Sequence, residues 1–241
     1  MTPGRPQAVL FDLDDTLIEY APAAAREREA VTEAVRDHLP TGAVAGFLDR
    51  FDAYLFRHHA EVDTGRVPVA EFRDRRLRHA MRPWHSPDSA LCRRVAACAD
   101  ATAASVGLAA GAAAVLAALR DDGVRVGIVT NGPLGIQTAK CTRLGLTDAV
   151  DTLVTSQDVG RTKPDGEVFH EALRRLGVRP GAAVVVGDSW ENDVLGGLRA
   201  GLAGAVHIGP DRGAVPAPPG LLGRAERAGD EVLHLLEDLH A

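Results

Sequence analysis

The sequence contains few aromatic residues and no excess of positive charge. Phe, Trp and Tyr together make up 4% of the 241 residues, and the formal net charge is −6. A protein that binds nucleic acid needs a basic surface for the phosphates and, for single strands, aromatic rings on which bases stack. The composition therefore argues against nucleic acid as a partner.

Long apolar runs and paired cysteines are also missing. No stretch approaches the ~20 apolar residues of a membrane-spanning helix. The first seven residues lead directly into an apolar segment, which leaves no room for a secretory signal. The three cysteines, Cys92, Cys98 and Cys141, form no CxxC pair and are odd in number. We therefore expect a cytoplasmic protein with reduced, mostly buried thiols and no membrane partner.

Residues 17–106 show helical periodicity throughout. Helices are expected at about 22–39, 44–58, 69–81 and 88–102, separated by short polar breaks. The clearest apolar stripe has a spacing of three and four residues and contains Val44, Phe47, Leu48, Phe51, Tyr54 and Leu55. Four helices in succession predict a small helical bundle.

From Gly107 onward, β-branched segments alternate with helical ones. Strands are expected at 124–129, 153–155, 183–186 and 205–208, with helices at 111–120, 135–144, 165–176 and 191–200. This alternation predicts a parallel sheet with helices on both faces. The apolar segment at 8–13 must join that sheet, because a single strand cannot bury both of its faces. Residues 17–106 are then an insertion, followed at the other end of the chain by a loop at 210–220 and an amphipathic helix at 230–240.

Polar residues of unusual kinds follow four of these segments. They are Asp12, Asp14, Thr130, Asn131, Lys163, Asp188 and Asp193. Taken singly, Thr130 could cap a turn, Lys163 could be a solvated loop residue, and Asp193 could stabilise the first turn of a helix. In an open parallel sheet, however, ligands bind beyond the carboxyl ends of the strands. Their joint placement at that edge therefore favours a single site.

The charge of such a site requires compensation. Asp12, Asp14, Asp188 and Asp193 would oppose the single cation of Lys163. Each pair of carboxylates at ~4 Å would cost about 4 kcal/mol at an effective dielectric constant near 20. Oxygen ligands without a nearby histidine favour Mg²⁺ over zinc. We therefore expect Mg²⁺ as cofactor, with one aspartate protonated.

The four loops resemble, in the same order, the four motifs of the haloacid dehalogenase-like (HAD) hydrolase superfamily. The motifs are Asp-x-Asp-x-Thr at 12–16, Thr130 after a strand, Lys163 before a helix, and Gly-Asp-x(4)-Asp at 187–193. The resemblance covers about half of the chain. It implies a Rossmann-like doubly wound core, residues 1–16 and 107–241, with an inserted helical cap of the C1 type at 17–106.

The same resemblance implies a role for each motif residue. Asp12 would be the nucleophile that forms an aspartyl-phosphate, and Asp14 the general acid and base. Thr130, the amide of Asn131 and Lys163 would bind the phosphoryl group. The metal-site residues would be Asp12, Asp14 through its backbone carbonyl, Asp188 and Asp193, the last orienting Lys163 or a metal-bound water.

The expected function is a Mg²⁺-dependent phosphatase for a small phosphorylated metabolite, such as a sugar phosphate or a nucleotide. A cap that closes over the site excludes large substrates. Dehalogenases lack an acid at the position of Asp14, so dehalogenation is disfavoured. A phosphomutase and a non-catalytic phospho-ligand-binding protein remain alternatives, as do monomer and homodimer. The segment 158–164 favours the nucleotidase and acylneuraminate-phosphatase branches.

Three other features have ordinary interpretations. The arginine-rich run at 73–79 fits a solvated helix face better than a substrate-binding surface. Trp84 and His85 fit the core or the hinge of the cap, and Trp190 fits packing.

Overall fold

The chain forms two compact units in the computed structural model, which describes residues 5–210 and 217–237. One unit contains the chain up to Glu19 and the chain from Gly107 onward, and the other contains Tyr20–Val106. The break lies after Glu19 rather than after Thr16. The reason is that β2 (Ile18–Glu19) pairs in antiparallel fashion with β3 (Gly107–Leu108), although 17–106 was expected to be helical throughout.

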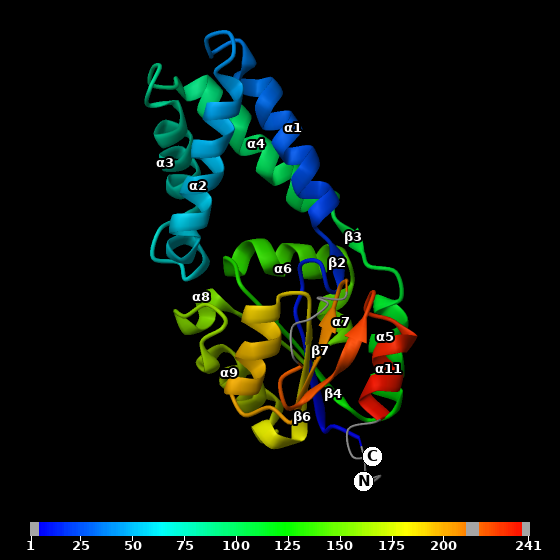
Figure 1. Ribbon diagram of the computed structural model, residues 1–241. Coiled ribbons are helices and arrows are strands. Elements are labelled where there is room, and N and C mark those ends of the chain that lie inside the picture. Colours follow the sequence, from blue (N-terminus) through cyan, green and yellow to red (C-terminus); the bar gives the residue numbers. More distant parts are fainter. Residues whose placement is uncertain (1–4, 211–216, 238–241) are drawn as a thin grey trace. The chain divides into compact units, whose positions relative to one another are not determined.

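A sheet of six parallel strands forms the centre of the α/β unit (Figure 1). Its order is β5-β4-β1-β6-β7-β8. The strands are β1 (Ala8–Phe11), β4 (Arg125–Thr130), β5 (Thr152–Thr155), β6 (Ala183–Gly187), β7 (Gly204–Ile208) and β8 (Leu221–Ala225). β1 lies between β4 and β6, where Phe11 pairs with both Ile128 and Val186. This is the Rossmann-like doubly wound sheet that the sequence predicts.

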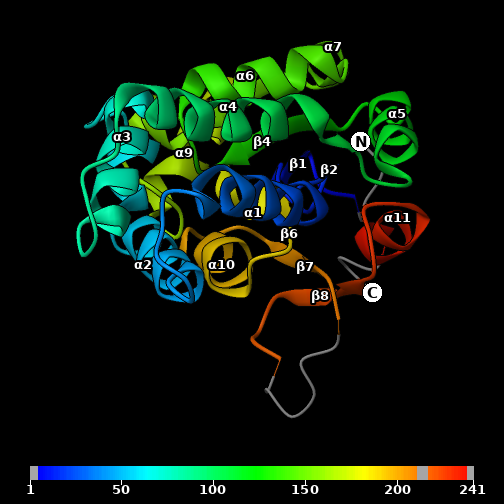
Figure 2. The same cartoon turned by 90° about the horizontal axis from the view of Figure 1, so that it is seen from above.

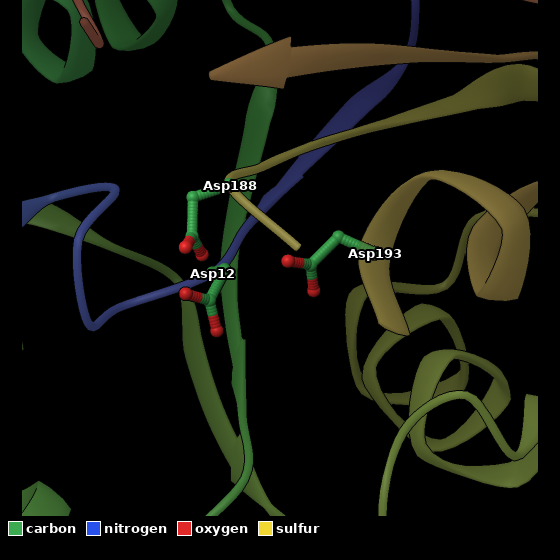
Figure 3. Close-up of side chains that lie close together, drawn as sticks. All are labelled: Asp12, Asp188 and Asp193. Carbon is green, nitrogen blue, oxygen red and sulfur yellow. The ribbon is translucent and has the colours of Figure 1, made fainter. Parts of the chain in front are cut away.

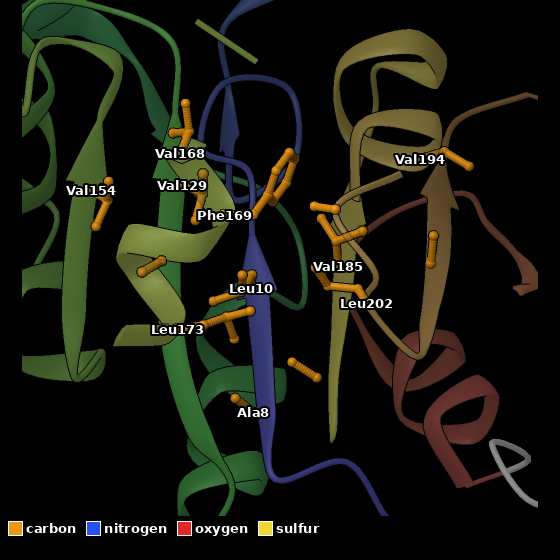
Figure 4. Close-up of a cluster of buried hydrophobic side chains, with 14 residues drawn as sticks. Ala8, Leu10, Val129, Val154, Val168, Phe169, Leu173, Val185, Val194 and Leu202 are labelled. Carbon is orange, nitrogen blue, oxygen red and sulfur yellow. The ribbon is translucent and has the colours of Figure 1, made fainter. Parts of the chain in front are cut away.

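Helices cover both faces of this sheet. They are α5 (Ala112–Asp121), α6 (Leu134–Arg143), α7 (Leu146–Ala149), α8 (Ser156–Val159), α9 (Gly166–Leu176), α10 (Gly196–Arg199) and α11 (Asp230–Glu237). Ala8 and Leu10 of β1 face α9, whose Phe169 and Leu173 belong to the same buried cluster (Figure 4). On the opposite face α5 and α11 pack side by side (Figures 1 and 2). β1 and β6 are buried along their whole length, which explains why they are continuous apolar runs in the sequence.

Strand β8 is a structural element that the sequence did not reveal. It lies in the stretch at 210–226, of which 211–216 fall outside the described residues. Gly223 interrupts its apolar pattern because a Cβ there would overlap Leu235 of α11. The glycine therefore permits close packing of helix on strand and conceals the strand from pattern reading. The last expected helix, 230–240, is described as far as Glu237.

The second unit consists of four helices. They are α1 (Ala21–Arg36), α2 (Val44–Asp63), α3 (Val69–Met81) and α4 (Ser89–Ser105). α1 packs on α4 and α2 packs on α3. The buried centre contains Val35, Phe47, Leu77, Met81 and Leu91. These helices correspond to the four that periodicity predicts.

In the described ranges, no helix combines the length and the apolar composition needed to cross a membrane. All three cysteines are free, and Cys141 is buried.

Candidate active site

The carboxyl ends of β1, β4 and β6 bring the sequence-predicted residues together. Asp12 follows β1, and its backbone N–H donates to the carbonyl of Val186 in β6. Thr130 ends β4, and Asp188 follows β6 directly. Because parallel strands end at the same edge, residues from opposite ends of the sequence meet there.

Asp12, Asp188 and Asp193 form a cluster of carboxylates (Figure 3). One oxygen from each lies within 4.8 Å of the other two. Asp12 and Asp193 are buried, whereas Asp188 is partly exposed. The Asp188 backbone N–H donates to Thr16 Oγ1 at 3.1 Å, which ties this loop to the one after β1.

Lys163 joins two members of this cluster. Its ammonium donates to Asp12 Oδ1 and to Asp193 Oδ1, each at 2.6 Å, and to the carbonyl of Val129 at 2.8 Å. Only 4% of Lys163 is exposed. All three donors of the ammonium therefore have partners within the protein, which is the condition for burying a charge.

The local fold around β6 explains how Asp193 reaches Lys163. Trp190–Leu195 form a π-helical turn rather than the start of the single helix expected at 191–200. The Asp193 Oδ2 atom accepts from the backbone N–H of Ser189 at 3.0 Å. A Cβ on Gly187 would overlap the Asp193 side chain. Only glycine at 187 leaves room for this carboxylate.

The electrostatics of the site reflect excess negative charge. Burial, aided by Asp193 and Asp188 and opposed by Lys163, raises the pKa of Asp12 from 3.8 to about 8. Burial together with Asp193 raises the pKa of Asp188 to about 6. Burial would lower the pKa of Lys163, but the carboxylates of Asp12 and Asp193 outweigh it and raise that pKa above its usual value.

Asn131 links Lys163 to the end of β4. The Lys163 backbone N–H donates to Asn131 Oδ1 at 2.8 Å, and Asn131 Nδ2 donates to the Lys163 carbonyl at 3.2 Å. The hydroxyl of Thr130 donates to the Asn131 carbonyl at 3.3 Å. The two residues thus lie beside the loop that carries Lys163. Their binding of phosphate stays a prediction.

Asp14 lies in a different environment from Asp12. Lys140 Nζ donates to its two carboxylate oxygens at 2.7 and 3.0 Å, and Gln137 Nε2 donates to Asp14 Oδ2 at 3.0 Å. Gln137 and Lys140 are buried residues of α6. The carboxylate of Asp14 is not part of the three-aspartate cluster.

Sequence reasoning missed Gln137 and Lys140 because they belong to no recognised motif. One signal in the sequence could have drawn attention to Lys140. Of the 27 basic residues counted as Lys and Arg, Lys140 and Lys163 are the only lysines.

The acidic cluster suits a hard divalent cation. Its donors are carboxylate oxygens without a histidine or cysteine, the ligand set that Mg²⁺ prefers. The raised pKa values of Asp12 and Asp188 indicate negative charge that such a cation would offset. Both oxygens of Asp193 already accept hydrogen bonds, so its arrangement fits the orienting of Lys163. Metal contact through the Asp14 carbonyl stays a prediction.

Comparisons with known proteins point to one family. The family model of the haloacid dehalogenase-like hydrolases matches residues 6–201. Ribulose-1,5-bisphosphate 5-phosphatase of Halopiger xanaduensis is 34% identical over 81% of this chain and 82% of that protein. Glyceraldehyde 3-phosphate phosphatase of Methanopyrus kandleri is 34% identical over 81% of each.

A solved structure with the same fold is that of YfnB from Bacillus subtilis, described as a HAD-hydrolase bound to magnesium. It has a TM-score of 0.71 and 22% identity, and the match covers 96% of this chain and 99% of that one. The family model, the two phosphatase relatives and the residues at the carboxyl edge of the sheet agree, and the chain belongs to the haloacid dehalogenase-like hydrolase family.

Proposed function

We propose that the protein is a Mg²⁺-dependent phosphatase that hydrolyses a small phosphomonoester through an aspartyl-phosphate on Asp12. The observation that carries the proposal is the separate pairing of two aspartates in one motif. Asp12, at the end of β1, forms an ion pair with Lys163, and Asp14 forms an ion pair with Lys140 of α6. Phosphoryl transfer needs a nucleophile and a distinct acid and base, and these environments separate the two roles.

In the first step an oxygen of Asp12 attacks phosphorus and the bond to the leaving alcohol breaks. Asp14, carrying a proton at this stage, gives it to the departing oxygen. In the second step water attacks the aspartyl-phosphate, Asp14 takes the proton of that water, and inorganic phosphate leaves. Asp12 is regenerated, so the two steps sum to the hydrolysis of one ester bond.

The remaining residues stabilise charge. Lys163 offsets the charge of Asp12 and of the phosphoryl oxygens, and Asp193 holds Lys163 in place. Thr130 and the backbone N–H of Asn131 bind phosphoryl oxygens. Mg²⁺, held by Asp12, Asp188 and the Asp14 carbonyl, would supply electrostatic stabilisation of the transferring group.

The substrate class follows from the relatives. Two of them are named for ribulose-1,5-bisphosphate and glyceraldehyde 3-phosphate, both small sugar phosphates. We propose a phosphorylated metabolite of this size for the present enzyme. Asp14 opposes a dehalogenase, because a departing halide needs no proton.

The test is release of 4-nitrophenol from 4-nitrophenyl phosphate, followed by phosphate release from a panel of phosphorylated metabolites. We expect turnover that requires Mg²⁺ and that falls by at least ~10⁴-fold in Asp12→Asn. The Asp122→Asn variant, an exposed aspartate at the end of α5, serves as the control. Turnover without a divalent cation, or an active Asp12→Asn enzyme, would refute the proposal.

A further inference from the structure

We propose that Lys140 and Gln137 are positioning residues that hold the Asp14 carboxylate during proton transfer. This inference rests on the proposed phosphatase function. Both side chains are buried on α6, with 4% and 2% exposure, while Thr138 and Ala139 between them are exposed. A separation of three residues places side chains on the same face of a helix. The buried face of α6 thus delivers two donors to a single carboxylate.

Gln137 makes hydrogen bonds with one end of its amide only. Its Nε2 lies 3.0 Å from Asp14 Oδ2, 2.7 Å from Thr130 Oγ1 and 3.2 Å from the Asn131 carbonyl. Its Oε1 is buried and has no partner among the described residues. An unpaired buried acceptor is a cost that an apolar side chain would avoid. We therefore infer that the role of the Gln137 amide lies in the hydrogen bonds that its nitrogen donates to Asp14, Thr130 and Asn131.

The backbone next to Thr130 is shaped around this amide. Gly132 has φ +144°, and a Cβ there would lie 3.1 Å from the end of the Gln137 side chain. That separation is tighter than ordinary van der Waals contact. Glycine at 132 therefore lets Gln137 reach Thr130 and Asp14 together.

Lys140 is an unusual choice in this chain. Arginine supplies 25 of the 27 basic residues, and both lysines are buried beside an aspartate of the first motif. Lysine presents a compact charge on a flexible stem, whereas arginine presents a rigid planar fork. A compact ammonium can contact both oxygens of Asp14, as Lys140 does, and can adjust as the carboxylate gains and loses its proton.

The pairing has a defined consequence for the first step. When Asp14 gives its proton to the leaving oxygen, it becomes a carboxylate that Lys140 and Gln137 stabilise and hold still. Loss of Lys140 therefore makes proton donation less favourable. The effect must depend on the leaving group, because a weakly basic phenolate departs without a proton and a strongly basic one does not.

A series of aryl phosphates, from 2,4-dinitrophenyl to 4-methylphenyl phosphate, tests this consequence. The value of kcat/KM reports the steps up to cleavage of the ester bond. In Lys140→Met we expect kcat/KM to fall about 100-fold for 4-methylphenyl phosphate and less than about fivefold for 2,4-dinitrophenyl phosphate. Lys140→Arg, which keeps the charge but replaces the compact ammonium with a planar fork, should recover part of this loss. Gln137→Met should show the same trend to a smaller extent.

The control is Arg143→Met, which removes an exposed cation from the last turn of the same helix. It should leave the dependence on the leaving group unchanged. An equal loss for every ester in Lys140→Met, or no loss, would overturn the positioning role. If wild-type enzyme shows no Mg²⁺-dependent turnover, the proposed function fails instead, and the spectrum described next still decides whether Lys140 holds Asp14.

The scarcity of lysine gives a direct spectroscopic test. Protein grown with lysine labelled at Cε and Nζ should show two side-chain NMR signals, and Lys140→Arg identifies one of them by its loss. Asp14→Asn should shift the Lys140 signal and leave that of Lys163 nearly unchanged. An unshifted Lys140 signal would overturn the proposal independently of the kinetics.

Discussion

The two lysine–aspartate pairs of the site differ in how firmly they are enclosed. Lys163 binds two carboxylates and a carbonyl, and its partner Asp12 has a side-chain exposure of 9%. Lys140 binds both oxygens of Asp14, and the Asp14 side chain is 27% exposed. The first pair fixes a charge inside the protein, whereas the second leaves a carboxylate open to reactants. Under the proposed function, one motif would therefore supply a rigid nucleophile and an accessible proton carrier.

Breaking the enclosed pair should have the largest effect. Lys163→Met leaves Asp12 and Asp193 as buried carboxylates without their cation, a change that costs about 3–5 kcal/mol of stability. It also removes the charge that is proposed to face the phosphoryl group, so kcat should fall by ~10²–10³-fold as well. Urea unfolding and steady-state kinetics on the same preparation would measure both. A Lys163→Met variant as stable as wild type, with only its activity reduced, would contradict the inference that Lys163 stabilises the buried carboxylates.

Breaking the open pair should affect activity far more than stability. Asp14→Asn keeps the size of the side chain and removes the proton carrier, so kcat should fall about 10²-fold or more with 4-nitrophenyl phosphate. Mg²⁺ affinity, measured by calorimetry, should change little, since only the Asp14 backbone carbonyl is proposed as a ligand. A large loss of Mg²⁺ binding would mean that the side chain itself contacts the metal.

The enclosure can be probed without touching a charged residue. Gly187→Ala places a methyl group where the Asp193 side chain lies. We expect a destabilisation of about 1–3 kcal/mol from overpacking, together with lower activity as Asp193 releases Lys163. Gly181→Ala, where a Cβ meets no atom within 4 Å, is the matched control and should be neutral. Thermal unfolding of the two variants distinguishes crowding at the site from a general effect of replacing glycine.

The smallest effect should appear in the pH dependence of stability without metal. The folded-state pKa values of Asp12 and Asp188 are raised to about 8 and about 6, from 3.8. Between pH 3.8 and these raised pKa values, the folded protein holds protons on Asp12 and Asp188 that the unfolded chain has released. The stability that they contribute is complete below pH 3.8 and is lost as the pH rises through 6 and then 8.

The measurement is the unfolding midpoint as a function of pH, in EDTA and in Mg²⁺. The midpoint in EDTA should decline toward alkaline pH, and Mg²⁺ should flatten the decline by replacing those protons. The Asp188→Asn variant, which lacks one of the two groups, should decline less steeply than wild type in EDTA. A midpoint in EDTA that rises over the same range would show that the carboxylates are already compensated within the protein.

The enclosed pair could be anticipated from the sequence, and the open pair could not. Asp12 and Asp188 follow apolar strands and Lys163 precedes a helix, and the geometry of parallel sheets brings such positions to one edge. Asp193 could be anticipated from its place in the Gly-Asp-x(4)-Asp motif at 187–193. Lys140 and Gln137 lie in the interior of α6, where three- and four-residue spacing indicates a helix but not which face meets a carboxylate. That information depends on tertiary packing.

The same limit explains the elements that were missed. The two-residue strands β2 and β3 are too short for any periodicity, and their pairing depends on contacts between residues 18–19 and 107–108. The π-helical turn at Trp190–Leu195 has an ordinary helical composition. The turn places the Asp193 side chain against Gly187, a contact that helical periodicity does not predict.

The burial of both lysines also determines how fast amine-reactive reagents modify the folded protein. Acylating reagents and aldehydes attack neutral, accessible ε-amines, and here both ε-amines are enclosed and bound to aspartates. The exposed Lys and Arg side chains in the described part of the chain are all arginines, whose guanidinium groups such reagents modify far less readily. Lysine modification should therefore be slow in the folded enzyme and should report the opening of its active site.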